Sequence, residues 1–373
     1  MALSPNYGFP EPDNSSLVKN GAQDIRALGD AIDTAVWNVG FGQAGKNKII
    51  NGDLFVNQRG FTSTTANATY TFDRWITSAS DGTSTFSAQT FTPGAAPVAG
   101  YEFLNYVRVI TTGQTLTSAS TIWRQLLEDV RTFAGQTVTV SFWAKANTGT
   151  PKIAVGGSQS FGSGGSTAVR LTPAQVTLST SWARYSTTIA VPSVSGKTIG
   201  SGSFLQVEFW LSAGSDFNTR TGSLGIQSNT FDMAGFQIEY GSKATPFQTA
   251  TGTIQGELAA CQRYYWRWTP TATTRQLSLG FADTTTVSNI VTTFPVTMRT
   301  SPTALEQSGT ATDYSLRVAG TTSIVLSAVP AFASATESAA VSNFNVASGL
   351  TAGQALATRA VNTNAYLAWS AEL

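Results

Sequence analysis

Apolar and polar side chains alternate along much of this sequence, which limits what the chain can fold into. In "TVTVSFWAK", Val138, Val140 and Phe142 fall on one face, and "FLQVEFWLS" repeats the pattern with Leu205 and Val207. A period of two is typical of a β-strand with one buried face. Segments rich in glycine and serine, such as "VGGSQSFGSGGST", separate these runs and predict turns. The sequence therefore predicts a mainly β protein.

One early segment breaks this pattern and predicts a short helix. Asn20 can cap the helix, and the apolar residues that follow recur at helical spacing: Ile25, Leu28, Ile32 and Val36. A helix of this length is marginal in isolation, and the rest of the sequence predicts no long helix to cover the stripe. We therefore expect helices from other copies of the chain to meet along these four residues.

The length of 373 residues exceeds what one core usually holds and predicts two domains with an appendage. The glycine-rich stretch "GFGQAGKNKIING" separates the helix from the first β region, and "IQGELAACQRYYWRW" begins the second. Many short strands within one region are typical of a jelly-roll β-sandwich. We predict an N-terminal segment over residues 1–45, a jelly roll over 46–250 and a second, C-terminal β-sandwich over 251–373.

The scarcity of reactive side chains excludes several classes of function. The chain has no histidine and one cysteine, Cys261, which excludes a Ser-His-Asp triad and histidine-containing metal sites. A net charge of +1 provides no steering toward nucleic acid, so no nucleic-acid partner is expected. No stretch is long and apolar enough to insert into a membrane, and no signal peptide is visible. We expect synthesis in a cytoplasm and no cofactor.

Three parts of the sequence resemble bacteriophage tail fibre and tail-associated proteins. The opening run "PNYGFPEPDNSSLVKNGAQDIRALGDAID" is similar to their N-terminal segment. The stretches "NKIINGDLFVNQRG", "YTFDRW", "VSFWAK" and "GFQIEYG" are similar to their carbohydrate-binding-module-like jelly rolls. The stretches "LAACQRYYWRW", "FPVTMRTSPT" and "SAEL" resemble their C-terminal tip region.

This resemblance implies a homotrimer in the virion tail, made in the host cytoplasm. Its N-terminal peptide would dock on other phage tail proteins, and the candidate docking residues are Tyr7, Phe9, Pro10 and Pro12. Its distal domains would contact polysaccharide on the host cell surface. The short helix would then begin a three-stranded stalk.

Tryptophans that point away from the apolar faces of their strands are candidate glycan contacts, because sugar C–H groups pack on aromatic rings. Trp143 and Trp210 have this placement, and Glu208 lies on the same side as Trp210. In the second β region, Trp266 and Trp268 share one face of a strand. The alternative for all four tryptophans is packing against another part of the chain or against another copy.

The resemblance also suggests one metal site. Carbohydrate-binding modules of this type often hold a structural calcium ion, and Asp53 and Asp232 stand at matching places in this chain. Carboxylate oxygens are hard ligands that suit calcium. The alternative is a capped turn at Asp53 and a solvated carboxylate at Asp232.

We expect an adhesin without enzymatic activity. Glycoside hydrolysis needs two carboxylates that face each other across a groove, and Glu128, Asp129 and Glu239 sit in no recognisable motif. No parallel β-helix repeat is visible. Adhesion would come from weak contacts multiplied by the number of copies. Two alternatives stay open: a surface-polysaccharide depolymerase and a purely structural tail component.

Overall fold

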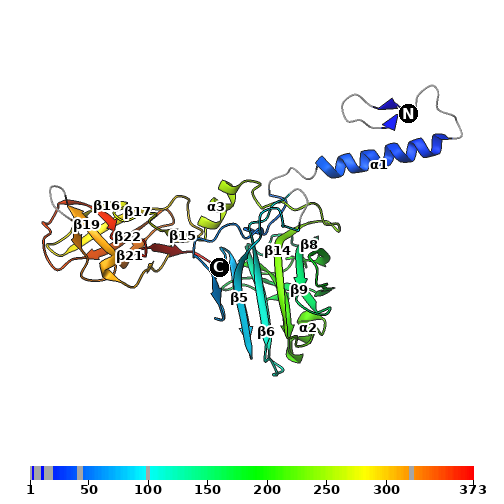
Figure 1. Cartoon of the computed structure of the whole chain (residues 1–373), viewed down its shortest axis with the longest axis horizontal. Coiled ribbons are helices and arrows are strands. Elements are labelled where there is room, and N and C mark those ends of the chain that lie inside the picture. Colours follow the sequence, from blue (N-terminus) through cyan, green and yellow to red (C-terminus); the bar gives the residue numbers. More distant parts are fainter. Residues whose placement is uncertain (1, 4–9, 12–19, 40–44, 98–100, 319–322) are drawn as a thin grey trace.

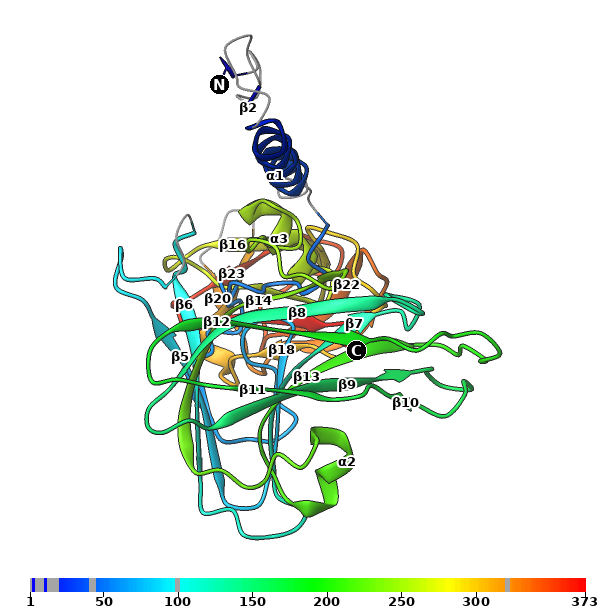
Figure 2. The same ribbon diagram turned by 90° about the vertical axis from the view of Figure 1, so that its right-hand side faces the viewer.

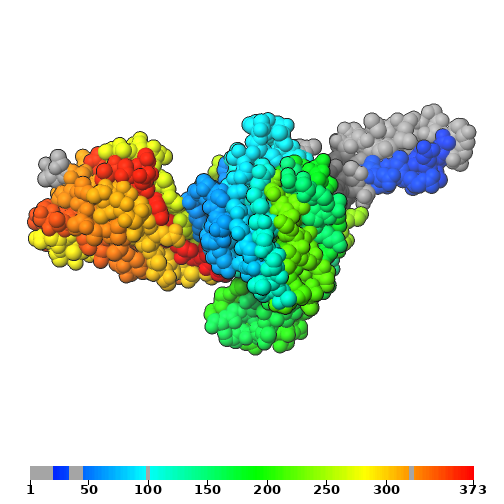
Figure 3. Space-filling view, turned by 60° about the horizontal axis from the view of Figure 1, so that its bottom comes forward, coloured from blue at the N-terminus to red at the C-terminus, as the bar shows by residue number. Residues whose placement is uncertain are grey.

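The computed structural model describes residues 2–3, 10–11, 20–39, 45–97, 101–318 and 323–373. Within them the chain is mainly β, which confirms the predicted fold class. Figures 1 and 3 show a helix, a central sandwich and a C-terminal unit arranged in a row. The helices are α1 (Gly21–Val39), α2 (Asn218–Thr221) and α3 (Ile254–Gln262), with 3-10 turns at Ser215–Phe217 and Ala311–Asp313, and a small ladder pairs β1 (Ala2–Leu3) with β2 (Pro10–Glu11).

Two antiparallel sheets, each six-stranded within the described residues, form the central sandwich (Figure 2). The first, called the β13 sheet, has the order β10-β9-β13-β7-β4, with β11 paired to β9. The second, called the β14 sheet, has the order β12-β8-β14-β6-β5-β3. The chain crosses repeatedly between them, as in a jelly roll. The strands are β3 (Ser63–Thr64), β4 (Trp75–Ser80), β5 (Thr83–Thr90), β6 (Asn105–Thr112), β7 (Ser120–Glu128), β8 (Thr137–Ala146), β9 (Lys152–Ser160), β10 (Val169–Arg170), β11 (Ala174–Thr177), β12 (Ala183–Ala190), β13 (Phe204–Ala213) and β14 (Asn229–Tyr240).

Aromatic side chains fill the space between the two sheets. The rings of Trp75 and Trp123 stack with centroids 5.2 Å apart. Phe209 meets both Phe142 and Phe236 edge-on, with centroid distances of 5.1 Å and 5.0 Å. All five side chains are fully buried. Since burial of apolar area dominates folding stability, these inward positions explain why the alternating sequence selects a sandwich.

The C-terminal unit begins at α3. The Thr253 hydroxyl caps this helix by accepting a hydrogen bond from the Gly256 amide at 3.0 Å. Beyond α3, a three-stranded sheet (β15-β24-β18) and a seven-stranded sheet (β20-β19-β23-β16-β17-β22-β21) share one core, which includes Trp369. Their strands are β15 (Tyr265–Trp268), β16 (Gln276–Ala282), β17 (Val287–Thr293), β18 (Glu306–Gln307), β19 (Tyr314–Val318), β20 (Ile324–Val325), β21 (Ala331–Ala335), β22 (Ala339–Asn345), β23 (Ala355–Ala360) and β24 (Leu367–Ser370).

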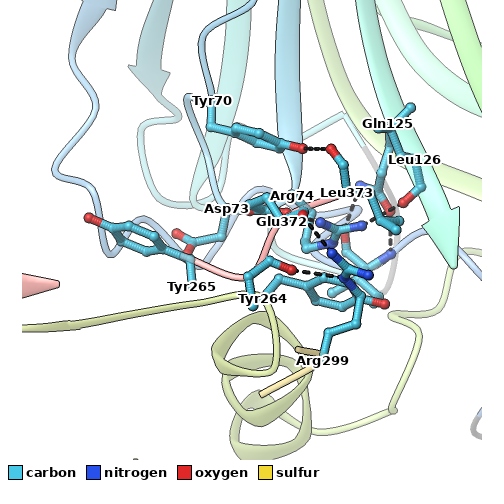
Figure 4. A network of polar contacts seen from close by, with 12 residues as sticks. Tyr70, Asp73, Arg74, Gln125, Leu126, Tyr264, Tyr265, Arg299, Glu372 and Leu373 are labelled. Atoms are coloured by element: carbon cyan, nitrogen blue, oxygen red, sulfur yellow. Dashed lines mark hydrogen bonds and ion pairs between the residues drawn. The ribbon is translucent and has the colours of Figure 1, made fainter. Parts of the chain in front are cut away.

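A buried charge network joins the end of this unit to the central sandwich (Figure 4). Arg74 forms an ion pair with Glu372, and its guanidinium lies 3.5 Å from the centre of the Tyr264 ring. Arg59 lies 3.3 Å from the same Glu372 carboxylate and stacks 3.6 Å above the Tyr265 ring. One glutamate near the C-terminus therefore serves two arginines of the sandwich.

Helix α1 stands apart from both sandwiches (Figure 1). Its bounds confirm the helix expected after Asn20. Ile25 is 69% exposed and Ile32 is 43% exposed, while Leu28 is half-buried. The side chain of Val36 lies outside the described residues. The apolar stripe that we expect to meet other copies is thus largely uncovered in the single chain.

The predicted docking residues lie mostly outside the part of the chain that the structure describes. Tyr7, Phe9 and Pro12 belong to that undescribed part, whereas Pro10 begins β2. Among the described residues, no helix combines the length and the hydropathy needed to cross a bilayer.

Candidate functional site

Trp143 does project from the outer face of the β14 sheet, but other side chains cover it. Its ring packs against Phe103 at 5.7 Å and Phe247 at 6.2 Å, and the Arg184 guanidinium lies 4.7 Å from its centre. Only 7% of Trp143 is exposed. The prediction that this tryptophan offers a sugar platform is wrong, because a second small core covers the outer face of the sheet at this point.

Trp210 is covered in the same way on the outer face of the β13 sheet. It is 0% exposed, and its ring lies 5.0 Å from Phe217, in the segment that follows its strand. The Trp210 indole N–H donates to Glu208 at 2.9 Å, and the carboxylate is also buried. Neither side chain can therefore stack on a glycan as predicted, and the alternative of packing within the chain is confirmed.

The cover over Trp143 depends on Gly235, and its replacement by alanine should be strongly destabilising. Gly235 has a φ of +63°, and an added Cβ would lie 2.6 Å from Phe103 and 2.7 Å from Trp143. Backbone strain and overpacking together should lower the free energy of unfolding by about 2 to 4 kcal/mol, measured by urea denaturation. Gly60→Ala is the matched control, because Gly60 has a φ of +65° and open space around it. Equal losses in the two variants would mean that packing against Trp143 contributes nothing.

The tryptophans of the C-terminal unit belong to the edge of its core. Trp266 stacks on buried Trp369 with ring centroids 5.3 Å apart. The centroid of the Phe294 ring lies 5.8 Å from that of Trp266. Trp266 and Trp268 are both half-buried and pack against the core cluster. Their remaining exposure leaves glycan contact at these two positions a prediction.

The two aspartates proposed for calcium have other partners. The carboxylate of Asp53 accepts a hydrogen bond from the Tyr101 hydroxyl at 2.6 Å, and burial raises the pKa of Asp53. Asp232 accepts two hydrogen bonds from Arg108, at 2.7 and 2.9 Å, and lies 3.6 Å from the Lys145 ammonium. Among the described residues, no group of three or more acidic, histidine or cysteine side chains is placed to hold a metal ion. The geometry gives the calcium hypothesis no support.

A different part of the β14 sheet brings half-exposed aromatic rings together with charged groups. Tyr106 on β6 and Trp182, just before β12, are both half-buried, and their ring centroids lie 5.5 Å apart at 84°. The buried ring of Phe91 packs against both, with centroid distances of 4.7 Å to Tyr106 and 5.3 Å to Trp182. This support holds the two rings in fixed orientations, which reduces the entropy that a ligand must remove on binding.

A row of charges crosses three strands beside these rings. Arg108 on β6, Asp232 on β14 and Lys145 on β8 are direct cross-strand neighbours. Lys145 lies 5.7 Å from the centre of the Trp182 ring, and Arg108 lies 5.9 Å from that of Tyr106. The row borders a hollow of about 240 Å³, here called the Asp232 hollow, lined by Arg108, Ile110, Lys145, Ala146, Asn147, Thr180, Thr230 and Asp232.

The same alternation that builds the core also builds this hollow. Val107 and Val109 point inward from β6, so Arg108 between them points outward. These residues carry no local sequence signal, because Arg108 and Asp232 lie 124 positions apart and neither belongs to a local motif. The sequence pattern that could have indicated the hollow is a charged residue at an outward position of an otherwise apolar strand. Most residues in such positions face bulk solvent and bind nothing.

The hollow and the two rings beside it provide groups that recognise a polyhydroxylated ligand. Hydrogen bonding to Asp232 raises the pKa of Arg108, so its guanidinium remains a charged donor. Burial raises the pKa of Tyr106, which keeps its phenol neutral and able to donate and accept. Aromatic faces with a few fixed polar groups are typical of small-ligand sites. The arrangement is therefore suited to binding a sugar through both its C–H and O–H groups.

Comparison with known proteins gives only distant structural likenesses. No protein-family model matches the sequence, and no curated protein matches it. A solved structure described as "CBM4 structure and function" is 16% identical, with a TM-score of 0.30, and covers 51% of this chain and 98% of its own. A family 11 carbohydrate-binding module from Clostridium thermocellum, in complex with a β-1,3-1,4-mixed-linked tetrasaccharide, is 12% identical, with a TM-score of 0.30, and covers 49% of this chain and 99% of its own.

One further likeness is to a phage protein. The enzymatically active domain of bacteriophage CBA120 tailspike protein 4 is 13% identical, with a TM-score of 0.31, and the match covers 52% of this chain and 21% of the tailspike chain. Likenesses at this level carry no argument about function. Each of these three matches covers about half of this chain.

Proposed function

We propose that this protein is a bacteriophage tail fibre protein that adheres to glycans on the host cell surface through the Asp232 hollow. The observation that carries the proposal is the placement of two half-exposed rings, Tyr106 and Trp182, beside the row of Arg108, Asp232 and Lys145. Ring faces would pack on sugar C–H groups, and the charged row would donate and accept hydrogen bonds from hydroxyls.

Attachment and valency complete the proposal. The uncovered stripe at Ile25 and Ile32 supports a homotrimer joined through α1, and the segment before it would dock on other tail proteins. A trimer presents three hollows at once. Since linked sites raise the effective concentration of each other, weak single-site affinity is enough for firm adhesion.

The test is binding to immobilised bacterial surface polysaccharides, followed by titration of the best binder with three variants of the intact chain. Trp182→Ala and Tyr106→Ala should each weaken binding by about tenfold or more, because stacking residues are typical binding hot spots. Tyr240→Ala is the matched control, since Tyr240 is an exposed tyrosine at the far end of β14. Its affinity should equal that of the natural chain.

Two results would contradict the proposal. Unchanged affinity in both Trp182→Ala and Tyr106→Ala, with circular dichroism like that of the natural chain, would exclude the Asp232 hollow as the glycan site. Release of reducing ends from the bound polysaccharide would make the protein a depolymerase instead of an adhesin.

A further inference from the structure

A second charged group lies on the opposite face of the sandwich, away from the Asp232 hollow. On the outer side of the β13 sheet, one buried carboxylate, Glu208, is surrounded by three arginines: Arg124, Arg170 and Arg220. These three arginines are called the arginine cluster. The Arg220 guanidinium donates to Glu208 at 2.7 Å. The carboxylate also accepts the indole N–H of Trp210, so it is held in place from two sides.

Strand register places the cluster on one face. Arg124 on β7 is the direct cross-strand partner of Glu208 on β13. Arg170 on β10 pairs with Ser158, which pairs with Gln206, two residues before Glu208. Partners in register, and residues two apart along a strand, project from the same side of a sheet. Both arginines therefore project from the side on which Glu208 lies.

The cluster carries more positive charge than its carboxylate neutralises. The Arg220 side chain is ion-paired. The side chains of Arg124 and Arg170 have no ion pair or hydrogen bond to the described residues, and the Arg124 Nε is buried without an acceptor. Burial lowers the pKa of Arg124 despite the nearby Glu208 charge. Burial and repulsion from Arg220 lower the pKa of Arg170. A bound anion would relieve this repulsion and supply the missing acceptors.

We propose that the arginine cluster binds the acid group of an acidic polysaccharide, either a sugar carboxylate or a sugar sulfate. A planar guanidinium binds such groups through two parallel hydrogen bonds. One compact cluster fits a single acid group, whereas nucleic acid needs an extended basic track, and a net charge of +1 does not provide one. The inference rests on the proposed glycan adhesion but uses the sheet opposite the Asp232 hollow.

The experiment titrates the intact chain with polygalacturonate, dextran sulfate, fully methyl-esterified galacturonan and single-stranded DNA. We expect an acidic polysaccharide to bind and the esterified polymer to bind at least about tenfold more weakly. Arg124→Gln and Arg170→Gln should each weaken acid binding by about tenfold. Arg131→Gln is the control, because Arg131 is an exposed arginine that pairs with Asp129. The tighter of the two acids identifies the carboxylate or the sulfate as the natural group.

Three outcomes overturn the inference: equal binding of acid and esterified polymers, acid binding that neither arginine variant weakens, or single-stranded DNA binding as tightly as the polysaccharides. Trp182→Ala separates this site from the proposed one. If that variant keeps acid binding while the Asp232 hollow fails its own test, the arginine cluster still stands. If acid binding disappears in Trp182→Ala but not in the arginine variants, the acid binds at the hollow and the cluster inference is wrong.

Discussion

Replacing Glu372 with glutamine should lower the free energy of unfolding by about 3 to 5 kcal/mol, the usual cost of removing one partner of a buried ion pair. Arg74 is 1% exposed at its side chain and pairs with Glu372, and Arg59 shares that carboxylate. The amide would remove the charge while keeping the shape. Two largely buried guanidiniums would then lose their common anion, and Arg74 is too deeply buried for bulk solvent to take its place.

Urea denaturation of the intact chain measures this loss. Glu337→Gln is the control, because Glu337 is an exposed glutamate of the same unit, and its effect should stay within about 0.5 kcal/mol. The double variant Arg74→Met with Glu372→Leu should recover most of the stability, since apolar residues of similar size often replace a buried pair without loss. A Glu372→Gln variant as stable as the control would show that the pair is already solvated.

This junction shows what the sequence could not reveal. Period-two alternation predicts which side of a strand faces inward, and on that basis Val138, Val140 and Phe142 were placed correctly in the core. Alternation is local, however, and says nothing about which strands become neighbours. Arg74 and Glu372 lie 298 positions apart, and their contact exists only after both sandwiches have formed.

The tryptophans illustrate a related limit. Trp143 and Trp210 lie on the outer faces of their strands, as the alternation predicts, but an outer face is not always exposed. A segment after β13 covers Trp210, and Phe103 with Phe247 covers Trp143. A short 3-10 turn supplies the first cover and irregular segments supply the second, so no local period predicts either. The half-exposed rings of Tyr106 and Trp182 likewise lie 76 positions apart and meet only in the folded sheet.

Ile32→Asp should convert the expected trimer into monomers while both sandwiches stay folded. Ile32 lies on the uncovered stripe of α1 with Ile25 and Leu28. In a parallel trimer the three copies of residue 32 would meet near the axis. Burying one unpaired charge in the seam between the helices costs roughly several kcal/mol of free energy, and the three neighbouring carboxylates would also repel one another. A helix of this length has little stability of its own to absorb that cost.

Light scattering at micromolar concentration gives the mass, and far-ultraviolet circular dichroism should keep the β signature of the sandwiches. Gln23→Asp is the matched control, since it adds the same charge on the opposite side of α1 and near the helix N-terminus, where a carboxylate is favourable. A monomeric mass for the natural chain would refute the trimer altogether. A trimeric mass for Ile32→Asp would instead show that another surface holds the copies together. The exposed neighbours Leu279 and Val291, paired across β16 and β17, would then be the contact to disrupt, because they form an uncovered apolar face at the other end of the chain.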